Sequence, residues 1–287
     1  MANLKEIRNR ISSVSSTMQI TSAMKMVSAA KLKRAQDAIT AMRPYAEKLT
    51  ELIQNLSGSL TGDAAGKYAE QREVNKVLIV AIASNRGLCG AFNANVLKQV
   101  KAISSRYNQD NVGIFAVGKK AYESLLKTEH VIANRSDIYD DLTFDNVADI
   151  AESLTNMFLD GQYDKIVLVY NQFKNAATQI VVEEQFLPLA PIEATEVVAT
   201  ELDYIYEPSK EEIVYTLIPK SLKTQLYKAI RDSYASEHGA RMTAMHKATD
   251  NAKDLRDQLK LTYNKARQAA ITNEILEIVG GAEALKG

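Results

Sequence analysis

The sequence predicts an α/β fold: a long antiparallel two-helix coiled coil, formed by the N- and C-terminal helices, with an inserted Rossmann-like open α/β domain. Heptad-spaced tracts at both ends of the chain, with alternating strand-like and helical runs between them, lead to this prediction. We expect an N-terminal helix at 1–57, a linker at 58–73, an α/β domain at 74–208 and a C-terminal helix at 209–287.

The N-terminal helix is predicted from an apolar stripe that recurs every three or four residues from Leu4 to Leu56. Thirteen of its sixteen positions are apolar, which is typical of a coiled-coil seam. Asn3 and Glu6 have the spacing of a capping box, and Pro44 should kink the helix without ending it. The polar members of the stripe lie together: Thr21, Lys25 and Ser28.

The C-terminal helix is predicted to begin after Pro208, where Ser209 and Glu212 form a capping box, and to be interrupted at Pro219. Its main stripe comprises Met245, Ala248, Ala252, Leu255, Leu259, Thr262, Ala266, Ala269 and Leu276. A second, offset stripe comprises Ile271, Ile275, Ile278 and Leu285. If both long helices enter and leave the central domain at one place, they must run antiparallel.

The central segment alternates between strand-like and helical runs, as in an open and largely parallel sheet. The predicted strands lie within residues 74–84, 112–117, 165–172 and 178–188. The predicted helices lie at about residues 91–106, 119–127 and 144–159.

Composition excludes several classes of protein. The 35 basic and 35 acidic residues cancel, and Cys89 is the single cysteine, so neither bulk attraction to nucleic acid nor a disulfide framework is expected. The longest apolar run, 77–83, is far shorter than the ~20 residues of a membrane span. The N-terminus resembles neither a secretion signal nor a transit peptide, so we expect a cytosolic protein.

No catalytic residue, metal site or cofactor is expected. The loop at 84–93 contains Gly87 and Gly90 without the GxGxxG spacing, and 117–121 lacks the Lys-Ser/Thr ending of a phosphate loop. Cys89 has no histidine near it in the sequence, and the three histidines lack the spacing of metal ligands. A nucleotide-binding α/β enzyme and a static coiled-coil scaffold remain alternative interpretations.

Charge is concentrated at the start of the chain, where residues 1–34 contain seven basic residues and one acidic residue. A face that is only solvated usually mixes both signs, so this tract favours an acidic protein partner. Nucleic acid is a weaker interpretation, because the tract has no aromatic residues for base stacking.

Five segments, at 5–14, 20–36, 84–93, 236–252 and 264–285, are similar to the γ subunit of F-type ATP synthases, and the likeness extends over essentially the whole chain. The resemblance implies a non-catalytic central rotor stalk, present once in each complex. Its coiled coil would lie inside the ring of α and β subunits, and its α/β domain would bind ε and the c ring. The chain would couple proton flow to ATP synthesis or hydrolysis at the cytoplasmic face of a bacterial membrane.

The resemblance also implies contact residues. Those expected to face the α/β ring are Met24, Lys25, Arg241, Arg267, Gln268, Thr272 and Glu274, together with the basic residues Lys31, Lys33 and Arg34. Those expected near ε and the c ring are Tyr204, Tyr206 and Glu207. The paired regulatory cysteines of plastid members are missing, since Cys89 stands alone, so a thiol switch of that kind is not expected.

Overall fold

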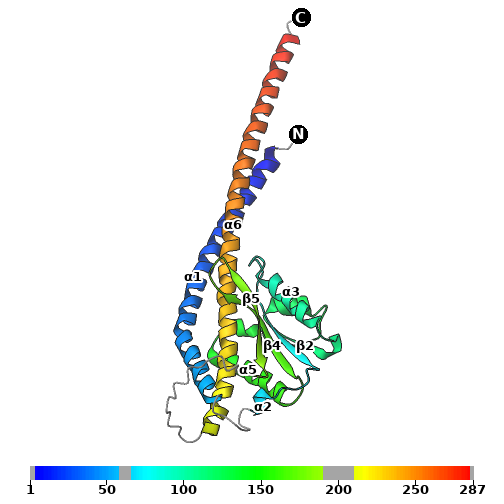
Figure 1. Cartoon of the computed structure of the whole chain (residues 1–287). Coiled ribbons are helices and arrows are strands. Elements are labelled where there is room, and N and C mark those ends of the chain that lie inside the picture. Colours follow the sequence, from blue (N-terminus) through cyan, green and yellow to red (C-terminus); the bar gives the residue numbers. More distant parts are fainter. Residues whose placement is uncertain (1–3, 58–65, 190–209, 285–287) are drawn as a thin grey trace. The chain divides into compact units, whose positions relative to one another are not determined.

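The computed structural model describes residues 4–57, 66–189 and 210–284 (Figure 1). Two long helices, α1 (Leu4–Ser57) and α6 (Lys210–Ala284), confirm the predicted terminal helices. The chain divides into two compact units, 1–28 with 242–287 and 29–241, and each is treated by itself below. The predicted caps at Asn3 and Ser209 and much of the predicted linker lie outside the described residues.

The unit of residues 29–241 contains a five-stranded sheet in the order β3-β2-β1-β4-β5. All neighbouring strands are parallel except β4 and β5, which confirms the open and largely parallel sheet. The strands are β1 (Val77–Ile82), β2 (Val112–Val117), β3 (Val131–Asn134), β4 (Lys165–Phe173) and β5 (Gln179–Leu187). The short edge strand β3 was not predicted, whereas the other four were.

Helices cover both faces of this sheet. Successive side chains of β1 point to opposite faces, and on each face they belong to a buried cluster that includes helix residues. On one face they pack against α5 (Phe144–Leu159) and the part of α6 at 218–230, and on the other against α3 (Phe92–Ser104) and α4 (Lys119–Leu125). The Thr143 hydroxyl accepts a hydrogen bond from the Asn146 N–H and so caps α5. The remaining helical elements are α2 (Gly66–Ala69) and two 3-10 turns, η1 (Gln109–Asn111) and η2 (Ser136–Tyr139).

The predicted interruption at Pro219 is wrong, because α6 continues through it. Proline inside a helix removes one backbone hydrogen bond and costs about 3 kcal/mol or more. Ile218 and Leu222, on either side of the proline, are buried in the core with Leu226. Burying each such side chain contributes roughly 1.5–3 kcal/mol, which is enough to keep the helix intact.

The unit of residues 1–28 and 242–287 is an antiparallel pair formed by the N-terminal half of α1 and the C-terminal part of α6. Contacts between the helices join rising residue numbers on α1 to falling numbers on α6, which confirms the antiparallel prediction. The contacts are Arg8 to Tyr263 at 2.7 Å, Met18 to Arg256 at 3.7 Å, Thr21 to Thr249 at 2.8 Å and Lys25 to His246 at 3.4 Å.

The predicted stripe on α1 is confirmed, since its described side chains from Leu4 to Leu49 are all buried or half-buried. The stripe on α6 is partly wrong, because Leu255 is 46% exposed and Thr262 is also exposed. The positions that are buried or half-buried at heptad spacing are Met245, Thr249, Ala252, Arg256, Leu259, Tyr263 and Ala266. Long side chains such as Arg256 and Tyr263 cover the seam with their apolar parts, which an apolar pattern does not detect.

Candidate functional site

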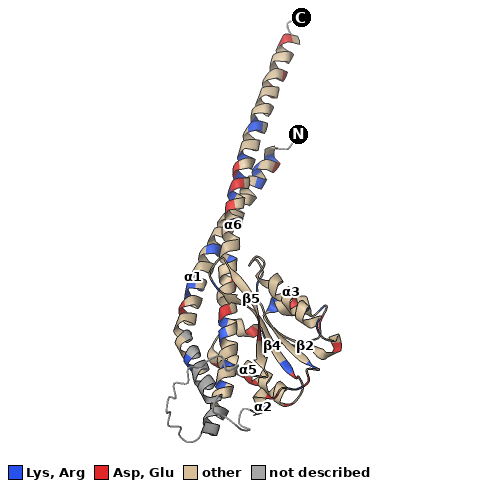
Figure 2. Ribbon diagram, in the orientation of Figure 1, with Lys and Arg blue, Asp and Glu red and all other residues tan. Residues whose placement is uncertain are grey.

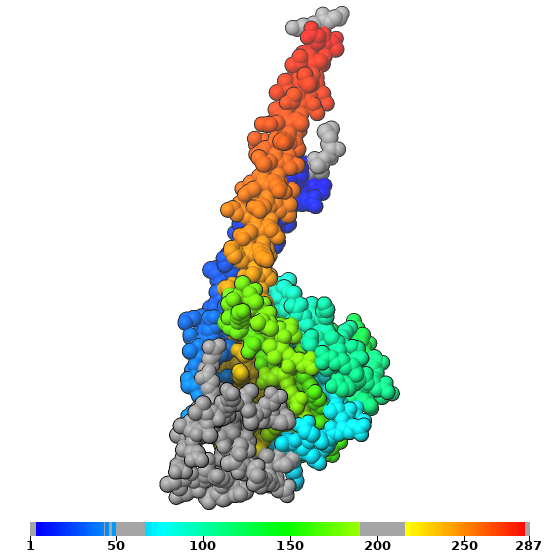
Figure 3. All heavy atoms as spheres, viewed as in Figure 1, coloured from blue at the N-terminus to red at the C-terminus, as the bar shows by residue number. Residues whose placement is uncertain are grey.

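The C-terminal end of α6 carries an apolar surface that the helix pair leaves uncovered. Every described residue from 267 to 284 is exposed (Figure 3). The exposed apolar residues are Ile271, Ile275, Leu276, Ile278 and Val279, with fractions from 47% to 65%. Within the described part of this unit, the cross-helix bond nearest this end is that from Arg8 to Tyr263. A single helix with clustered apolar side chains is typical of a surface that a partner covers.

The expected contact residues on this end of α6 lie on its surface. Arg267, Gln268, Thr272 and Glu274 are all exposed. They belong to the same stretch as the apolar residues of the offset stripe, so the end of α6 offers polar groups beside apolar ones. The last residue of that stripe, Leu285, lies outside the described residues.

Figure 2 shows basic residues along α1, and most of those in residues 4–34 are exposed. Lys31, Lys33 and Arg34 are exposed, and Lys33 forms an ion pair with Asp37 at 2.9 Å. Such an exposed i,i+4 pair contributes only a few tenths of a kcal/mol, so the ammonium group can exchange partners. The nearby apolar side chains Met26 and Val27 are 64% and 58% exposed.

Met24 and Lys25 are half-buried in the helix pair. The Lys25 ammonium lies 3.4 Å from His246 Nδ1, and the same nitrogen lies 3.4 Å from a carboxylate oxygen of Asp250. Lys25 therefore interrupts the apolar seam and finds a polar partner on α6. This arrangement explains how the predicted stripe tolerates a lysine.

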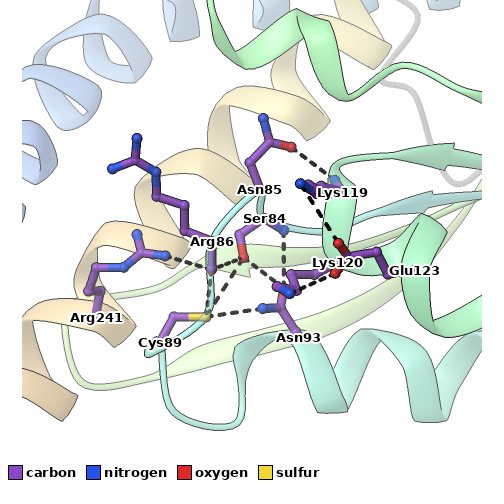
Figure 4. A network of polar contacts seen from close by, with 9 residues as sticks. All are labelled: Ser84, Asn85, Arg86, Cys89, Asn93, Lys119, Lys120, Glu123 and Arg241. Carbon is purple, nitrogen blue, oxygen red and sulfur yellow. Dashed lines mark hydrogen bonds and ion pairs between the residues drawn. The ribbon is translucent and has the colours of Figure 1, made fainter.

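Arg241 was expected to face the subunit ring, and in the described chain its side chain is buried. Its side chain is 9% exposed, and its Nη1 group bonds the Glu237 carboxylate at 2.5 Å. Its Nη2 group donates to the backbone carbonyl of Arg86 at 2.9 Å (Figure 4). The same group donates to the backbone carbonyl of Gly87 at 3.2 Å. Burial raises the pKa of the Glu237 carboxyl, and the Arg241 charge opposes that effect. Arg241 is thus engaged inside the chain.

The loop at 84–93 is a closed network of polar contacts (Figure 4). Ser84 donates to Asn93 Oδ1 through its backbone N–H at 3.1 Å and its hydroxyl at 3.0 Å. Asn93 Nδ2 donates to Cys89 Sγ at 3.3 Å, and Cys89 is 1% exposed. Burial raises the pKa of the Cys89 thiol, which disfavours the nucleophilic thiolate. The cysteine fills space in this network.

Two backbone donors at the start of α4, of the kind that bind phosphate, are already engaged. The Lys119 N–H donates to Asn85 Oδ1 at 2.9 Å, and the Lys120 N–H donates to the Ser84 carbonyl at 3.0 Å. Gly118 has a φ of 107°, and a Cβ there would collide with the Ala83 carbonyl. The glycine therefore permits a close approach between β2 and the loop after β1.

Sequence reasoning missed a buried polar segment of α6 at 232–241. His238 is 4% exposed, and neither ring nitrogen has a hydrogen-bond partner among the described residues. Burial lowers its pKa from 6.5 to about 3, and its ring meets the ring of Tyr234 edge-on at 4.5 Å. The hydroxyls of Ser233 and Ser236 are likewise buried and unbonded within the described chain. In the sequence, the departure of residues 232–241 from heptad spacing was the signal that could have revealed this segment.

Other candidate sites are weak or undescribed. Among the described residues, no three His, Cys, Asp or Glu side chains are grouped as metal ligands. None of the helices that the structure describes combines the length and apolar character of a membrane span. Tyr204, Tyr206 and Glu207 lie outside the described residues.

Comparison with solved structures finds the same fold in ATP synthase rotors. The chain has a TM-score of 0.59 and 26% identity to a chain in the central stalk and c-ring structure of Tetrahymena thermophila mitochondrial ATP synthase, covering 80% of this chain and 99% of that one. With a chain of the Euglena gracilis mitochondrial ATP synthase rotor, the TM-score is 0.66 at 19% identity, covering 93% and 98%. The second likeness shows the fold alone.

Comparison of sequences extends over the full length. A family model described as ATP synthase matches residues 3–285. The chain is 75% identical to the ATP synthase gamma chain of Flavobacterium psychrophilum and 74% identical to that of Flavobacterium johnsoniae, with 100% of both chains covered in each case. It is 55% identical to the ATP synthase gamma chain of Cytophaga hutchinsonii, with 99% of both chains covered. The chain therefore belongs to the ATP synthase gamma chain family.

Proposed function

We propose that this chain transmits torque between a membrane ring of c subunits and the catalytic ring of α and β subunits. As a gamma chain it is the central-stalk rotor subunit of ATP synthase, and catalysis takes place in the β subunits and not in this chain. The proposal adds the mechanical role of its surfaces. The observation that supports it best is the exposed apolar end of α6.

An apolar surface suits a part that turns. The hydrophobic effect is non-directional and scales with the apolar area removed from water, so Ile275 and Ile278 can slide past successive subunits without breaking fixed bonds. Ion pairs at an exposed surface contribute about 0.2–1 kcal/mol each, and they too can form and break in turn. A surface of this composition can hold the helix in place while letting it rotate.

We assign the ring contacts to exposed residues of this surface and of the basic tract, and to the half-buried residues Met24 and Lys25. They are Met24, Lys25, Lys31, Lys33, Arg34, Arg267, Gln268, Thr272 and Glu274. Arg241 is removed from the set because its donors are already engaged. The proposed contacts with ε and the c ring remain Tyr204, Tyr206 and Glu207, with one chain in each complex at the cytoplasmic face of a bacterial membrane.

The geometry argues against the two alternative functions. A nucleotide-binding enzyme would need free donors near the ends of the strands, yet two backbone donors at the start of α4 are engaged with Ser84 and Asn85. A static scaffold would have no use for an exposed apolar end beside exchangeable charges. Family membership agrees with the rotor interpretation.

The experiment replaces Ile275 and Ile278 together with Asp in the assembled complex. We expect charges on this face to weaken either assembly or the ratio of proton pumping to ATP hydrolysis, because a charge that enters an apolar contact is desolvated. The matched control replaces the same two residues with Leu, which keeps the apolar area and should retain coupling. Normal assembly and pumping by the Asp variant would contradict the proposed role.

A further inference from the structure

Arg241 joins α6 to the loop that follows β1. Its guanidinium is held by Glu237 on its own helix and by two consecutive carbonyls of the loop, at Arg86 and Gly87. A guanidinium offers planar, fixed donors, so these bonds constrain direction as well as distance. All these groups belong to the unit of residues 29–241.

The loop needs such a restraint, because its backbone has an unfavourable conformation. Leu88 has a φ of 62°, a value that a leucine seldom adopts, and its side chain is 66% exposed. Packing of that side chain therefore does not explain the conformation. The Gly87 carbonyl, which accepts a bond from Arg241, belongs to the peptide group that leads into Leu88.

The other side of the loop is tied to the sheet and to α4. Ser84 follows β1 directly, and the Lys120 N–H donates to its carbonyl. Asn85 accepts from the Lys119 N–H and donates to the Ser136 carbonyl at 2.9 Å. The loop thus forms a continuous set of bonds from α6 through the Arg86 and Gly87 carbonyls to β1 and α4.

Directional bonds tie this part of α6 to the sheet domain at Lys223, Gln225 and Arg231. The apolar residues at 218–230 resist separation from the sheet, but apolar contacts do little to oppose sliding. Further along, the side-chain polar atoms of Ser233, Ser236 and His238 make no hydrogen bond within the described chain. Gln225 and Arg231 bond the sheet domain earlier on the helix, at the Gln185 and Leu142 carbonyls. Arg241 provides the bonds nearest the end of this unit.

We propose that Arg241 is a positioning residue that holds the loop at 84–93 against α6, so that twist in the helix passes into the sheet through β1. This inference rests on the proposed torque function. It changes the role of Arg241 from a contact with the subunit ring to an internal clamp. Leu88 and Cys89 keep their positions because the clamp fixes the peptide groups before them.

Cys89 provides a local readout, because it is the single cysteine of the chain and is buried in the clamped loop. The assembled complex is exposed to N-ethylmaleimide, and labelling of the Cys89 peptide is followed by mass spectrometry. We expect Arg241→Gln to raise the labelling rate by about tenfold or more, since charged hydrogen bonds to the loop are lost. Arg241→Lys should lie between this variant and the wild type, because an ammonium cannot reproduce the fork.

The matched control is Arg231→Gln, which removes an arginine of the same helix that bonds Tyr227 and the Leu142 carbonyl. We expect this control to leave Cys89 labelling at the wild-type rate. Unchanged labelling in Arg241→Gln, or an equal rise in both glutamine variants, would overturn the clamp.

The functional arm compares proton pumping with ATP hydrolysis in the same complexes. The inference predicts a lower pumping-to-hydrolysis ratio in Arg241→Gln and a normal ratio in Arg231→Gln. A loosened loop with a normal ratio would refute the positioning role while leaving the proposed function intact. The proposed function itself would fail if the wild-type complex hydrolysed ATP without pumping.

Discussion

His238 shows how a single residue of α6 can differ from what its helix suggests. Its ring is buried against Tyr234, and neither nitrogen finds a hydrogen-bond partner among the described residues. Burial of an imidazole without a partner favours the neutral form, so its pKa falls from 6.5 to about 3. The folded chain therefore takes up a proton at this site less readily than the unfolded chain.

This difference predicts acid sensitivity. Since the pKa of His238 is lower in the folded chain, its stabilising effect is complete above about pH 6.5 and is lost as the pH falls toward about 3. Between about pH 7.5 and pH 5 the wild type should lose about 2 kcal/mol of unfolding free energy through this residue. His238→Gln should lose less, as measured by urea unfolding of the full chain at both pH values.

The exposed His130 provides the control for that experiment. His130→Gln should keep the pH dependence of the wild type, because this substitution leaves the buried ring of His238 in place. If His238→Gln and the wild type lost the same stability on acidification, burial of His238 would not be the cause.

At the scale of elements, the apolar pattern predicted α1 better than α6. The seam of α1 consists mostly of apolar residues, so the positions from Leu4 to Leu49 could be identified by counting. On α6 the buried positions include Thr249, Arg256 and Tyr263, and counting chose Leu255 and Thr262 instead. Strand β3 was missed because it has four residues, half-buried or exposed, at the edge of the sheet.

Some parts of the candidate site could be predicted from the sequence, and others could not. Local sequence revealed the basic tract and the offset stripe, since charge and apolar side chains can be read directly. The clamp depends on Arg241 lying beside carbonyls about 150 residues earlier, at Arg86 and Gly87. Long-range backbone contacts of this kind leave no mark in the composition of either segment.

The corrected stripe on α6 predicts different effects for two leucines. Leu259 is half-buried in the seam, whereas Leu255 is 46% exposed. Leu259→Ala should cost about 1–2 kcal/mol of unfolding free energy, and Leu255→Ala should remain within about 0.5 kcal/mol of the wild type. Both substitutions are measured by heating the full chain and following the loss of its helical circular dichroism signal. A larger effect at Leu255 would restore the stripe predicted from the sequence.

At the scale of the whole molecule, the features that characterise the chain are its exposed surfaces and not a reactive centre. Its total charge is zero, yet basic residues gather on the first part of α1 and apolar residues remain exposed at the end of α6. Its cysteine is buried, and its most perturbed histidine is held neutral. These features agree with the family of the chain, whose role in ATP synthase is mechanical.

The central claim is that this chain turns while the β subunits hydrolyse ATP. The most direct measurement attaches an optical probe to Asp110→Cys, an exposed position in η1, in a chain that also has Cys89→Ser. The complex is immobilised through its catalytic subunits, and the probe is observed at several ATP concentrations. We predict rotation in a single direction at a rate that follows ATP hydrolysis. A probe that stays still while the same complexes hydrolyse ATP would contradict the account.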